Sequence, residues 1–326
     1  MGPEDRIRGA GPDHGGGRTG RAGRAGGRGL RPPVVLVPAF KRVEASRRAI
    51  ASLRAAGAEH IVFVDDEGAA GGADLAREFP GLDVIPTTTP VWWTGAIVLG
   101  IERARARGAE AVLFFNQDVT CAKDYFARLG EGVDAQPGAI VGSAVMYAQE
   151  PGRVWSAGGS VEWWGRGIRV LHHGAPASEL KPEPFQADWL FGMGTYVPCE
   201  VFDRIGLPDA ARFPMAWGDL DFSLRAKRAG IPVLVAPQGV LFHEVGDYDA
   251  RIAGAPTARQ YAGWMADDKH NLSLSAHAEI WRRHGPKLIW PLSLLLRVGF
   301  LCVNFFRIRF FFPSSPSKKS SSDVSR

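Results

Sequence analysis

Acidic residues in this sequence follow apolar runs or open a helical pattern. Asp65 and Asp66 end the run "HIVFVDD", Asp118 ends "LFFNQD", and Asp219 and Asp221 open "GDLDFSLRAKRAG". Side chains at the carboxyl ends of parallel strands can converge, because open α/β sheets bind their ligands there. One or two carboxylates, completed by water and substrate phosphates, make the usual magnesium site. A further acid beyond such a metal can act as a general base.

Each acid taken alone has a simpler interpretation. Asp66 or Asp219 can be a helix N-cap, and Asn and Asp are ordinary turn residues after a strand. Acids at several of these positions favour a shared site over independent caps. The capping interpretation stays open for each residue.

The elements that must position these acids alternate along the first 120 residues. Continuous apolar strands that alternate with helices are typical of a parallel sheet covered on both faces. The helices end at glycine or proline, as expected for C-caps. We expect strands at 34–38, 60–66, 82–87 and 109–118, and helices at 43–56, 72–79 and 92–107.

The fold class is therefore α/β, a Rossmann-like sandwich with a central, mostly parallel sheet. "PAFK" follows the first strand, so the G-x-G-x-x-G fingerprint of a dinucleotide domain is absent. The second half mixes short strands, a glycine-rich hairpin and two helices. We expect them at 139–147, 154–174, 187–206, 217–230 and 231–246.

Composition limits the partners and the compartment. The chain has 326 residues, 45% of them hydrophobic, and a net charge of +5 that is concentrated at its ends. Residues 1–31 form an Arg/Gly-rich arm that we expect to be disordered, with contact to nucleic acid or acidic lipid as the alternative. The near-neutral body argues against nucleic-acid binding. Cys121, Cys199 and Cys302 include no CxxC pair, which fits a reducing cytoplasm and argues against a disulfide framework or zinc site.

The segment 286–312 is the most hydrophobic part of the chain. Ser293, Arg297, Asn304 and Arg307 share one narrow helical face, and a central arginine costs about 2.5–3.5 kcal/mol in a membrane span. We expect a helix lying on the inner membrane surface, with its arginines on anionic headgroups. Packing on the core or in a dimer, and a true span, are the alternatives. A polar tail, 313–326, is expected to be disordered.

Several separated motifs resemble glycosyltransferase family 2. "VWWTGAIVLGIERA" followed by "VLFFNQDV" is similar to its rhamnosyltransferase-like group, which carries a "WWTG" motif. "DWLFGMGTYVPCEVFDRIGLPD", "FPMAWGDLDFSLRAKRAG" and "VLFHEVG" resemble the family's acceptor region. The resemblance implies a GT-A domain over 32–285, with a nucleotide-binding half (32–120) and an acceptor half (121–285).

The resemblance also implies an activity. It is a metal-dependent, inverting transfer of a sugar from a dTDP-, UDP- or GDP-sugar to a glycan or lipid-linked acceptor in cell-surface polysaccharide biosynthesis. The enzyme would be cytoplasmic and peripheral to the inner membrane.

The implied donor side lies in the first half. Asp65 would accept hydrogen bonds from the base. Asp118 would be the main carboxylate on Mg²⁺ or Mn²⁺, because Asn116 replaces the first acid of the family's D-x-D. His243 would reach the metal or the pyrophosphate, or else be a histidine satisfied at a strand end. The residues expected to contact the nucleotide sugar are Pro38, Ala39, Asp65, Asp66, Trp93, Thr94, Gly95, Asn116 and Asp118.

The implied acceptor side lies in the second half. Asp219 occupies the position of the catalytic base, and Asp221 is the second candidate because the usual Glu-Asp pair reads Gly218-Asp219. Trp189, Gly192 and Trp217 are expected near the acceptor, although tryptophans also fill cores.

Departures from the family pattern keep two other functions open. Val98 replaces the asparagine of "NxGI", which affects donor identity more than reaction class. A sugar-phosphate nucleotidyltransferase is one alternative, although "PAFKR" fits its G-x-G-x-R loop poorly. A non-catalytic binding protein on the same fold is the other.

Overall fold

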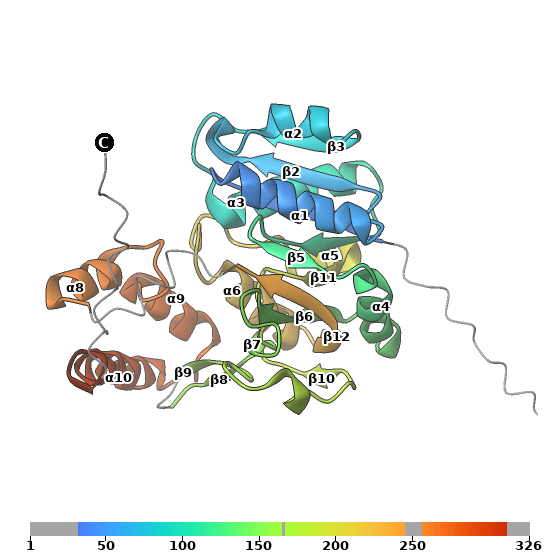
Figure 1. The fold of residues 1–326 in the computed structure, drawn as a ribbon. Helices are drawn as coiled ribbons and strands as arrows, with labels where there is room; N and C mark the ends of the chain where they lie inside the picture. The colour runs from blue at the N-terminus through green and yellow to red at the C-terminus, as the bar shows by residue number, and fades with distance from the viewer. Residues whose placement is uncertain (1–31, 165–166, 245–255, 312–326) are drawn as a thin grey trace, which may run out of the picture.

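The computed structural model describes residues 32–164, 167–244 and 256–311, with side chains in the last helix through Arg307. The Arg/Gly-rich arm and the C-terminal tail predicted from the sequence lie outside these residues. Figure 1 shows a curved sheet with helices on both faces and a group of C-terminal helices to one side. This confirms the predicted α/β class.

The first half supplies four parallel strands. Strand β1 pairs with both β2 and β4, and β2 pairs with β3, so their order is β3-β2-β1-β4. All four carboxyl ends therefore lie along one edge of the sheet. The elements of this half are β1 (Val34–Ala39), α1 (Val43–Ala55), β2 (Ile61–Asp65), η1 (Asp66–Gly68), α2 (Gly72–Glu78), β3 (Leu82–Pro86), α3 (Trp92–Ala106) and β4 (Ala111–Phe114).

The second half extends the same sheet. Strand β11 is antiparallel to β4 and β6, while β6 and β12 are parallel to each other, so β12, β6, β4, β1, β2 and β3 share one direction. The central sheet is thus mostly parallel, as predicted. The elements are β5 (Val119–Cys121), α4 (Tyr125–Ala135), β6 (Ile140–Tyr147), β7 (Val154–Ser156), β8 (Gly159–Glu162), β9 (Gly167–Val170), η2 (Ala177–Glu179), β10 (Phe185–Gln186), β11 (Thr195–Pro198), α5 (Cys199–Ile205), α6 (Gly218–Arg228) and β12 (Val233–His243).

Two apolar clusters fill the two faces of the sheet. On one face, Ile50 and Leu53 of α1 pack with Leu129 of α4. On the other, Ile101 of α3 packs with Phe222 of α6. Alternating strand residues contribute to the two clusters, because successive side chains of a strand point to opposite faces.

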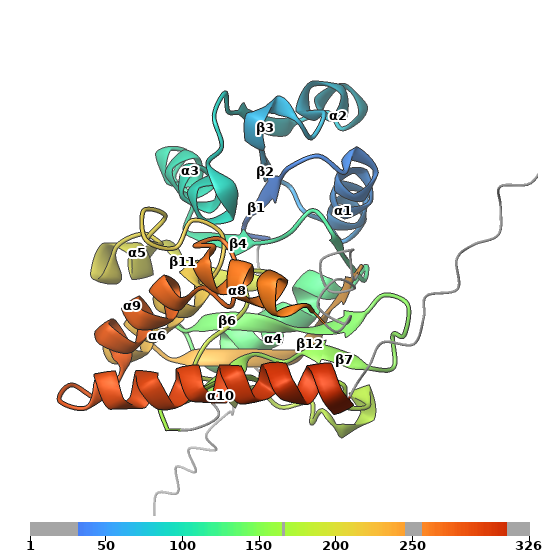
Figure 2. The ribbon, with the colours of Figure 1, turned by 90° about the vertical axis from the view of Figure 1, so that its left-hand side faces the viewer.

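Three helices complete the described chain. They are α8 (Ala258–Ala266), α9 (Leu274–His284) and α10 (Trp290–Phe311). Thr257 and Gln260 form a capping box at the start of α8, and Ser273 caps α9. A third apolar cluster joins Leu224 of α6 to Trp281 of α9. Figure 2 shows α10 running across the molecule in front of the sheet.

Helix α10 turns Ser293 and Arg297 of its polar stripe toward the protein, whereas Arg307 of the same stripe is exposed. Ser293 is fully buried, accepts from Nε1 of Trp281 at 2.9 Å and donates to the carbonyl of Trp163. Arg297 is 9% exposed, and its stem packs against Gly167. The expectation that Arg297 would meet lipid headgroups is therefore wrong, because the serine and arginine fill positions between α10 and the body.

The outer face of α10 is apolar. By length and composition alone, Trp290–Arg307 is long and apolar enough to cross a membrane. Its mean hydropathy is 1.2, and 17% of this segment is buried. Large apolar side chains of the helix and the turn before it are exposed to solvent. They are Leu288, Ile289, Leu292, Leu295, Leu296, Phe300, Val303 and Phe306.

Candidate functional site

A small cavity opens at the carboxyl edge of the sheet, where β1, β2 and β4 end. Its volume is ≈ 140 Å³, and most of its walls are apolar. It includes Pro38, Ala39, Asp66 and Trp93, four of the residues predicted to contact a nucleotide sugar. The lining residues are Pro38, Ala39, Phe40, Asp66, Glu67, Pro90, Trp92, Trp93, Ala96, Gln117 and Met215.

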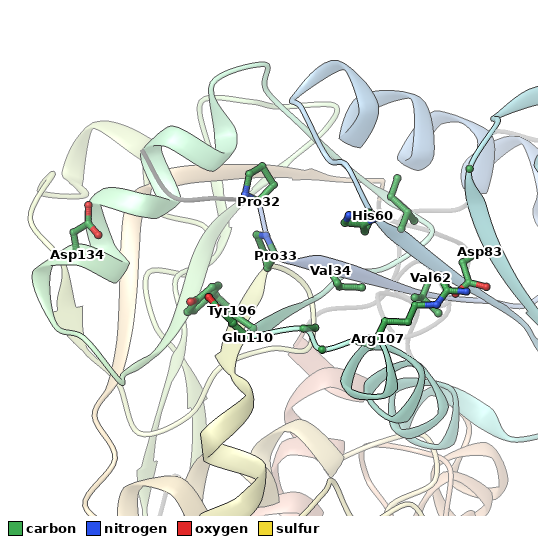
Figure 3. Close-up of a pocket in the computed structure, with 16 residues that line it drawn as sticks. Pro32, Pro33, Val34, His60, Val62, Asp83, Arg107, Glu110, Asp134 and Tyr196 are labelled. Atoms are coloured by element: carbon green, nitrogen blue, oxygen red, sulfur yellow. The ribbon is translucent and has the colours of Figure 1, made fainter. Parts of the chain in front are cut away.

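A larger cavity lies at the opposite edge of the sheet. It has a volume of ≈ 540 Å³ and is bordered by Pro33, His60, Arg107 and Tyr196 (Figure 3). No residue predicted to bind substrate or metal lines this cavity. We place the site at the smaller cavity, because ligands of open α/β sheets bind at the carboxyl ends of the strands.

Asp65 holds the loop that follows β2. Its Oδ1 accepts from the amide of Ala70 at 2.6 Å, and its Oδ2 accepts from the amide of Gly72 at 2.8 Å. The side chain is buried and does not line the cavity. Asp65 therefore stabilises this loop, and its predicted contact with a base stays a prediction, since its side chain is not among those that line the cavity.

Asp66 holds the start of α3. Its Oδ1 accepts from the amide of Val91 at 2.9 Å and from the hydroxyl of Thr87 at 3.0 Å, while its Oδ2 accepts from the amide of Trp92 at 3.1 Å. A carboxylate that accepts hydrogen bonds from the first backbone amides of a helix satisfies donors that have no acceptor within the helix. Asp66 therefore acts as a cap, but for a helix more than 20 residues later in the chain.

Asp118 and His243 face each other at the site. Their strands β5 and β12 pair with His243 opposite Val119, and His243 Nε2 lies 3.8 Å from Asp118 Oδ2. The Arg42 guanidinium lies 3.1 Å from the same oxygen. Burial opposes ionisation of Asp118, but His243 and Arg42 outweigh it and hold the pKa of this carboxyl below its usual value.

Asp118 and His243 are suited to be two of the ligands of a divalent cation. In the part of the chain that the structure describes, no group of three or more His, Cys, Asp or Glu side chains is arranged to hold a metal ion. Nδ1 of His243 is buried and has no hydrogen-bond partner. A cation on Asp118 and His243 would need its other ligands from substrate and water, which is common for magnesium.

The amides before Asp118 have structural partners. Asn116 Oδ1 accepts from Nε1 of Trp93 at 2.8 Å. Gln117 accepts from the backbone amide of Phe40 at 3.3 Å and donates to the Phe40 carbonyl at 3.0 Å. Within "NQD", Asp118 alone faces the histidine.

A line of contacts joins this end of the site to Asp219. The Trp93 ring lies over Gly192, where an added Cβ would come 2.0 Å from Trp93 Cζ2. The Gly192 amide donates to Asp219 Oδ2 at 2.9 Å, and the Leu220 amide donates to Oδ1 at 2.8 Å. Burial raises the pKa of Asp219 despite these hydrogen bonds. Asn116, Trp93, Gly192 and Asp219 therefore form one connected group.

Asp221 lies in a different environment. Its side chain is 0% exposed and contacts Arg225 Nε at 2.9 Å, His284 Nε2 at 2.9 Å and Arg283 Nη1 at 3.3 Å. Burial opposes ionisation, but the His284 hydrogen bond and the arginines hold the pKa of Asp221 below its usual value. No substrate hydroxyl can reach this carboxylate, so its role is to join α6 to α9. The Asp221 alternative for the base is not supported.

The remaining predicted residues divide between the site and the core. Thr94 is fully buried, and its amide donates to the Pro214 carbonyl at 3.0 Å. Trp217 is half-buried and packs against His277 with ring centroids 4.9 Å apart. Trp189 is 5% exposed and belongs to the third apolar cluster. The expected acceptor contact by Trp189 is wrong, because its ring is enclosed by Gly159 and Phe191.

Several residues at or beside the site were not predicted from the sequence. Arg42 closely follows the first strand, and Trp92 is next to the predicted Trp93. Their positions in the sequence could therefore have indicated that both lie near the site. Met215 and Lys269 carried no signal, because they reach the cavity region from distant parts of the chain. Lys269 Nζ lies 4.3 Å from the centre of the Trp92 ring.

Comparison with known proteins finds a family match in the first half of the chain. Residues 34–188 match the family model described as Glycosyl transferase family 2. Residues 34–188 carry a family 2 glycosyltransferase domain. This confirms the family expected from the motifs. The matched residues include Asp118 and the cavity lining except Met215. Gly192, Asp219 and His243 also lie beyond them.

Two relatives extend the comparison. A dTDP-rhamnosyl transferase RfbF of Shigella flexneri is 25% identical over 169 residues, which are 50% of this chain and 54% of that protein. The crystal structure of GalNAc-T7 with UDP, GalNAc and Mn²⁺ aligns with a TM-score of 0.55 and 14% identity, covering 87% of this chain and 57% of that chain. This chain therefore spans little more than half the length of either protein. The structural match supports the GT-A fold around the family 2 domain.

Proposed function

We propose that this protein is a metal-dependent, inverting glycosyltransferase. It moves a sugar from a nucleotide sugar to a hydroxyl of a glycan or lipid-linked acceptor in cell-surface polysaccharide biosynthesis. The observation that carries the proposal is the connected group from Asn116 through Trp93 and Gly192 to Asp219. It links the donor side of a family 2 domain to a carboxylate suited to be a base.

Asp118 and His243 are the residues that would hold the metal. A bound Mg²⁺ or Mn²⁺ would neutralise negative charge on the departing nucleoside diphosphate. The presence of UDP and Mn²⁺ in the structurally similar GalNAc-T7 supports the use of a divalent cation with the nucleotide. Arg42 contacts Oδ2 of Asp118 at 3.1 Å, so its guanidinium would compete with a cation for that oxygen.

Asp219 is the general base of the proposed reaction. Each of its oxygens accepts one backbone hydrogen bond and keeps a second lone pair that can take the acceptor hydroxyl proton. The hydroxyl oxygen forms a bond to the anomeric carbon while the bond from that carbon to the diphosphate oxygen breaks. One displacement inverts the configuration, through a transition state of oxocarbenium character. The raised pKa of Asp219 makes it a stronger base than an exposed aspartate.

The nucleotide of the donor is dTDP or UDP in this proposal. The 25% identical relative is a dTDP-rhamnosyl transferase, and the structural neighbour was solved with UDP. Rhamnose is the sugar that the sequence relative favours.

We also propose that α10 lies on the cytoplasmic surface of the inner membrane. Its buried Ser293 and Arg297 leave an outer face of leucine, valine and phenylalanine. Exposed apolar surfaces of this kind mark interaction sites, and an amphipathic helix can bury such a face at the headgroup boundary. This position would bring the enzyme to a lipid-linked acceptor.

The reaction is tested with the full chain and a panel of dTDP-, UDP- and GDP-sugars, with and without Mg²⁺ or Mn²⁺. We expect a glycan acceptor and metal to increase release of nucleoside diphosphate from one donor. NMR of the product should show the anomeric configuration opposite to that of the donor. No release from any donor would overturn the proposed activity, and a retained configuration would overturn the single displacement.

A further inference from the structure

The cavity at the start of α3 has the dimensions and chemistry of a site for one flat ring. Its ≈ 140 Å³ lies below the range of about 300–1,000 Å³ that is usual for whole drug-sized ligands. Phe40, Pro90, Trp92 and Met215 contribute apolar surface, and Met215 is 48% exposed although it is large and apolar. An unsaturated ring would bury this surface.

The Trp92 backbone is fixed in an uncommon conformation. Its φ is 57°, in the left-handed region that bulky residues rarely adopt. Asp66 accepts hydrogen bonds from the amides of Val91 and Trp92 and so stabilises this turn. Residues held in such conformations cluster at ligand sites. Here the turn places the half-buried Trp92 at the wall of the cavity.

The Trp92 ring is held as well. The ammonium of Lys269 lies 4.3 Å from the ring centre, within the range of a cation–π interaction. Lys269 lies between α8 and α9, where its amide donates to Oδ1 of Asp267 at 3.0 Å. Lys269 does not line the cavity, so it contacts the indole without occupying the ligand space. The C-terminal helical segment thus braces a wall of a cavity in the family 2 domain.

We propose that Trp92 is the platform on which the nucleobase of the donor stacks, and that Lys269 is the residue that positions its indole. The ligand class is a nucleoside diphosphate with a single-ring base, since the small cavity accommodates a pyrimidine better than a purine. This inference rests on the proposed function and makes it more specific.

The test measures nucleotide affinity by calorimetry at constant Mn²⁺, using the full chain and its variants with dTDP, UDP and GDP. Trp92→Ala should weaken dTDP and UDP binding by about 5- to 150-fold, the range expected for loss of one base stack. Trp92→Phe keeps an aromatic face and should lose less. The control Trp164→Ala, at a tryptophan that is 46% exposed and outside the cavity, should leave affinity unchanged.

Lys269→Met should weaken binding by a smaller factor than Trp92→Ala. If Lys269 acts through the indole, Lys269→Met should add no loss in a Trp92→Ala background. Lys123→Met is the matched control at another exposed lysine. An equal further loss in the Trp92→Ala background would overturn the positioning role.

The remaining outcomes separate this inference from the proposed function. Unchanged pyrimidine-nucleotide affinity in Trp92→Ala and Trp92→Phe, with a wild type that binds, would overturn the platform and leave the transferase proposal standing. Equal binding of GDP and dTDP would overturn the single-ring preference. A wild type that binds none of the three nucleotides would contradict the proposed function itself.

Discussion

Two aspartates on the same helix occupy opposite electrostatic environments. Asp219 has only backbone amides as hydrogen-bond donors, and burial raises its pKa. Asp221 is surrounded by Arg225, Arg283 and His284, which keep its pKa low. A carboxylate without a cationic partner takes a proton more readily than one paired with two arginines and a histidine. The environment therefore separates the base from the structural residue.

Asp219→Asn should lower the rate of sugar transfer by about 100- to 10,000-fold, because it removes the general base. Nucleotide affinity should stay within about twofold of the wild type. Steady-state kinetics and calorimetry measure the two quantities. Asp134→Asn, at an exposed aspartate, is the control. Full transfer activity in Asp219→Asn would exclude it as the base.

The pH dependence of transfer tests the same residue. Asp219 acts only when deprotonated, and its pKa is raised above the ordinary 3.8. The kcat/KM of the wild type should therefore fall as the pH drops through a value above 3.8. An acidic limb at or below 3.8 in the pH–rate profile would contradict this assignment.

At the scale of elements, the periodic segments were predictable. The first strand was expected at 34–38 and is Val34–Ala39, and the third helix was expected at 92–107 and is Trp92–Ala106. Continuous apolar runs and glycine stops are local signals, so one sequence suffices to find them. The antiparallel insertion of β11 between β4 and β6 was not predicted, because strand order depends on contacts between distant segments.

The candidate site was predictable only in part, for the same reason. The motifs identified Asp118, His243, Gly192 and Asp219. The structure places His243 beside Asp118 and the Gly192 amide on Asp219, while their roles in binding and catalysis stay predictions. Local sequence did not show that Asp66 caps a distant helix. Nor did it show which face of α10 is buried, because a narrow polar stripe fits both a solvated face and a packed one.

Helices α6 and α9 are joined by the Asp221 ion pairs. Asp221→Asn leaves Arg225, Arg283 and His284 without their shared carboxylate, and breaking a buried pair typically costs about 3–5 kcal/mol. We expect a free energy of unfolding that is lower by about this amount in urea denaturation at pH 7. Asp74→Asn, at an exposed pair, should change it by less than about 0.5 kcal/mol.

The effect of Asp221→Asn should depend on pH. The folded pKa of Asp221 is lowered, so its stabilisation is present above the unfolded value near 3.8 and is lost as the pH falls through the folded pKa. The stability difference between wild type and variant should therefore shrink below pH 3.8. A difference that grows as the pH falls would contradict the ion-pair role.

At the scale of the whole molecule, α10 lies along one side of the body (Figure 2). The side chains that it exposes are largely apolar. Leu295 and Leu296 are 66% and 49% exposed, whereas Ser293 is bonded to Trp281. Truncation before α10 would remove that internal contact as well as the outer face. Substitutions on the outer face alone therefore separate membrane binding from folding.

The double variant Leu295→Glu/Leu296→Glu should lose binding to vesicles of phosphatidylglycerol and phosphatidylethanolamine, because charge opposes burial in the bilayer interface. Vesicle flotation measures the bound fraction. Circular dichroism should show unchanged helix content, since both side chains are exposed. Val170→Glu, on an exposed position outside α10, is the control. Undiminished flotation of the double variant would contradict docking through this face.

The central claim is that Asp118 and His243 hold a divalent cation together with a nucleoside diphosphate. The most direct measurement is calorimetric titration of dTDP and UDP, with and without Mn²⁺, into wild type and Asp118→Asn. Wild type should bind one of them more tightly with Mn²⁺, and Asp118→Asn should lose that enhancement while its fold is retained. An Mn²⁺ enhancement of the same size in both proteins would contradict the claim.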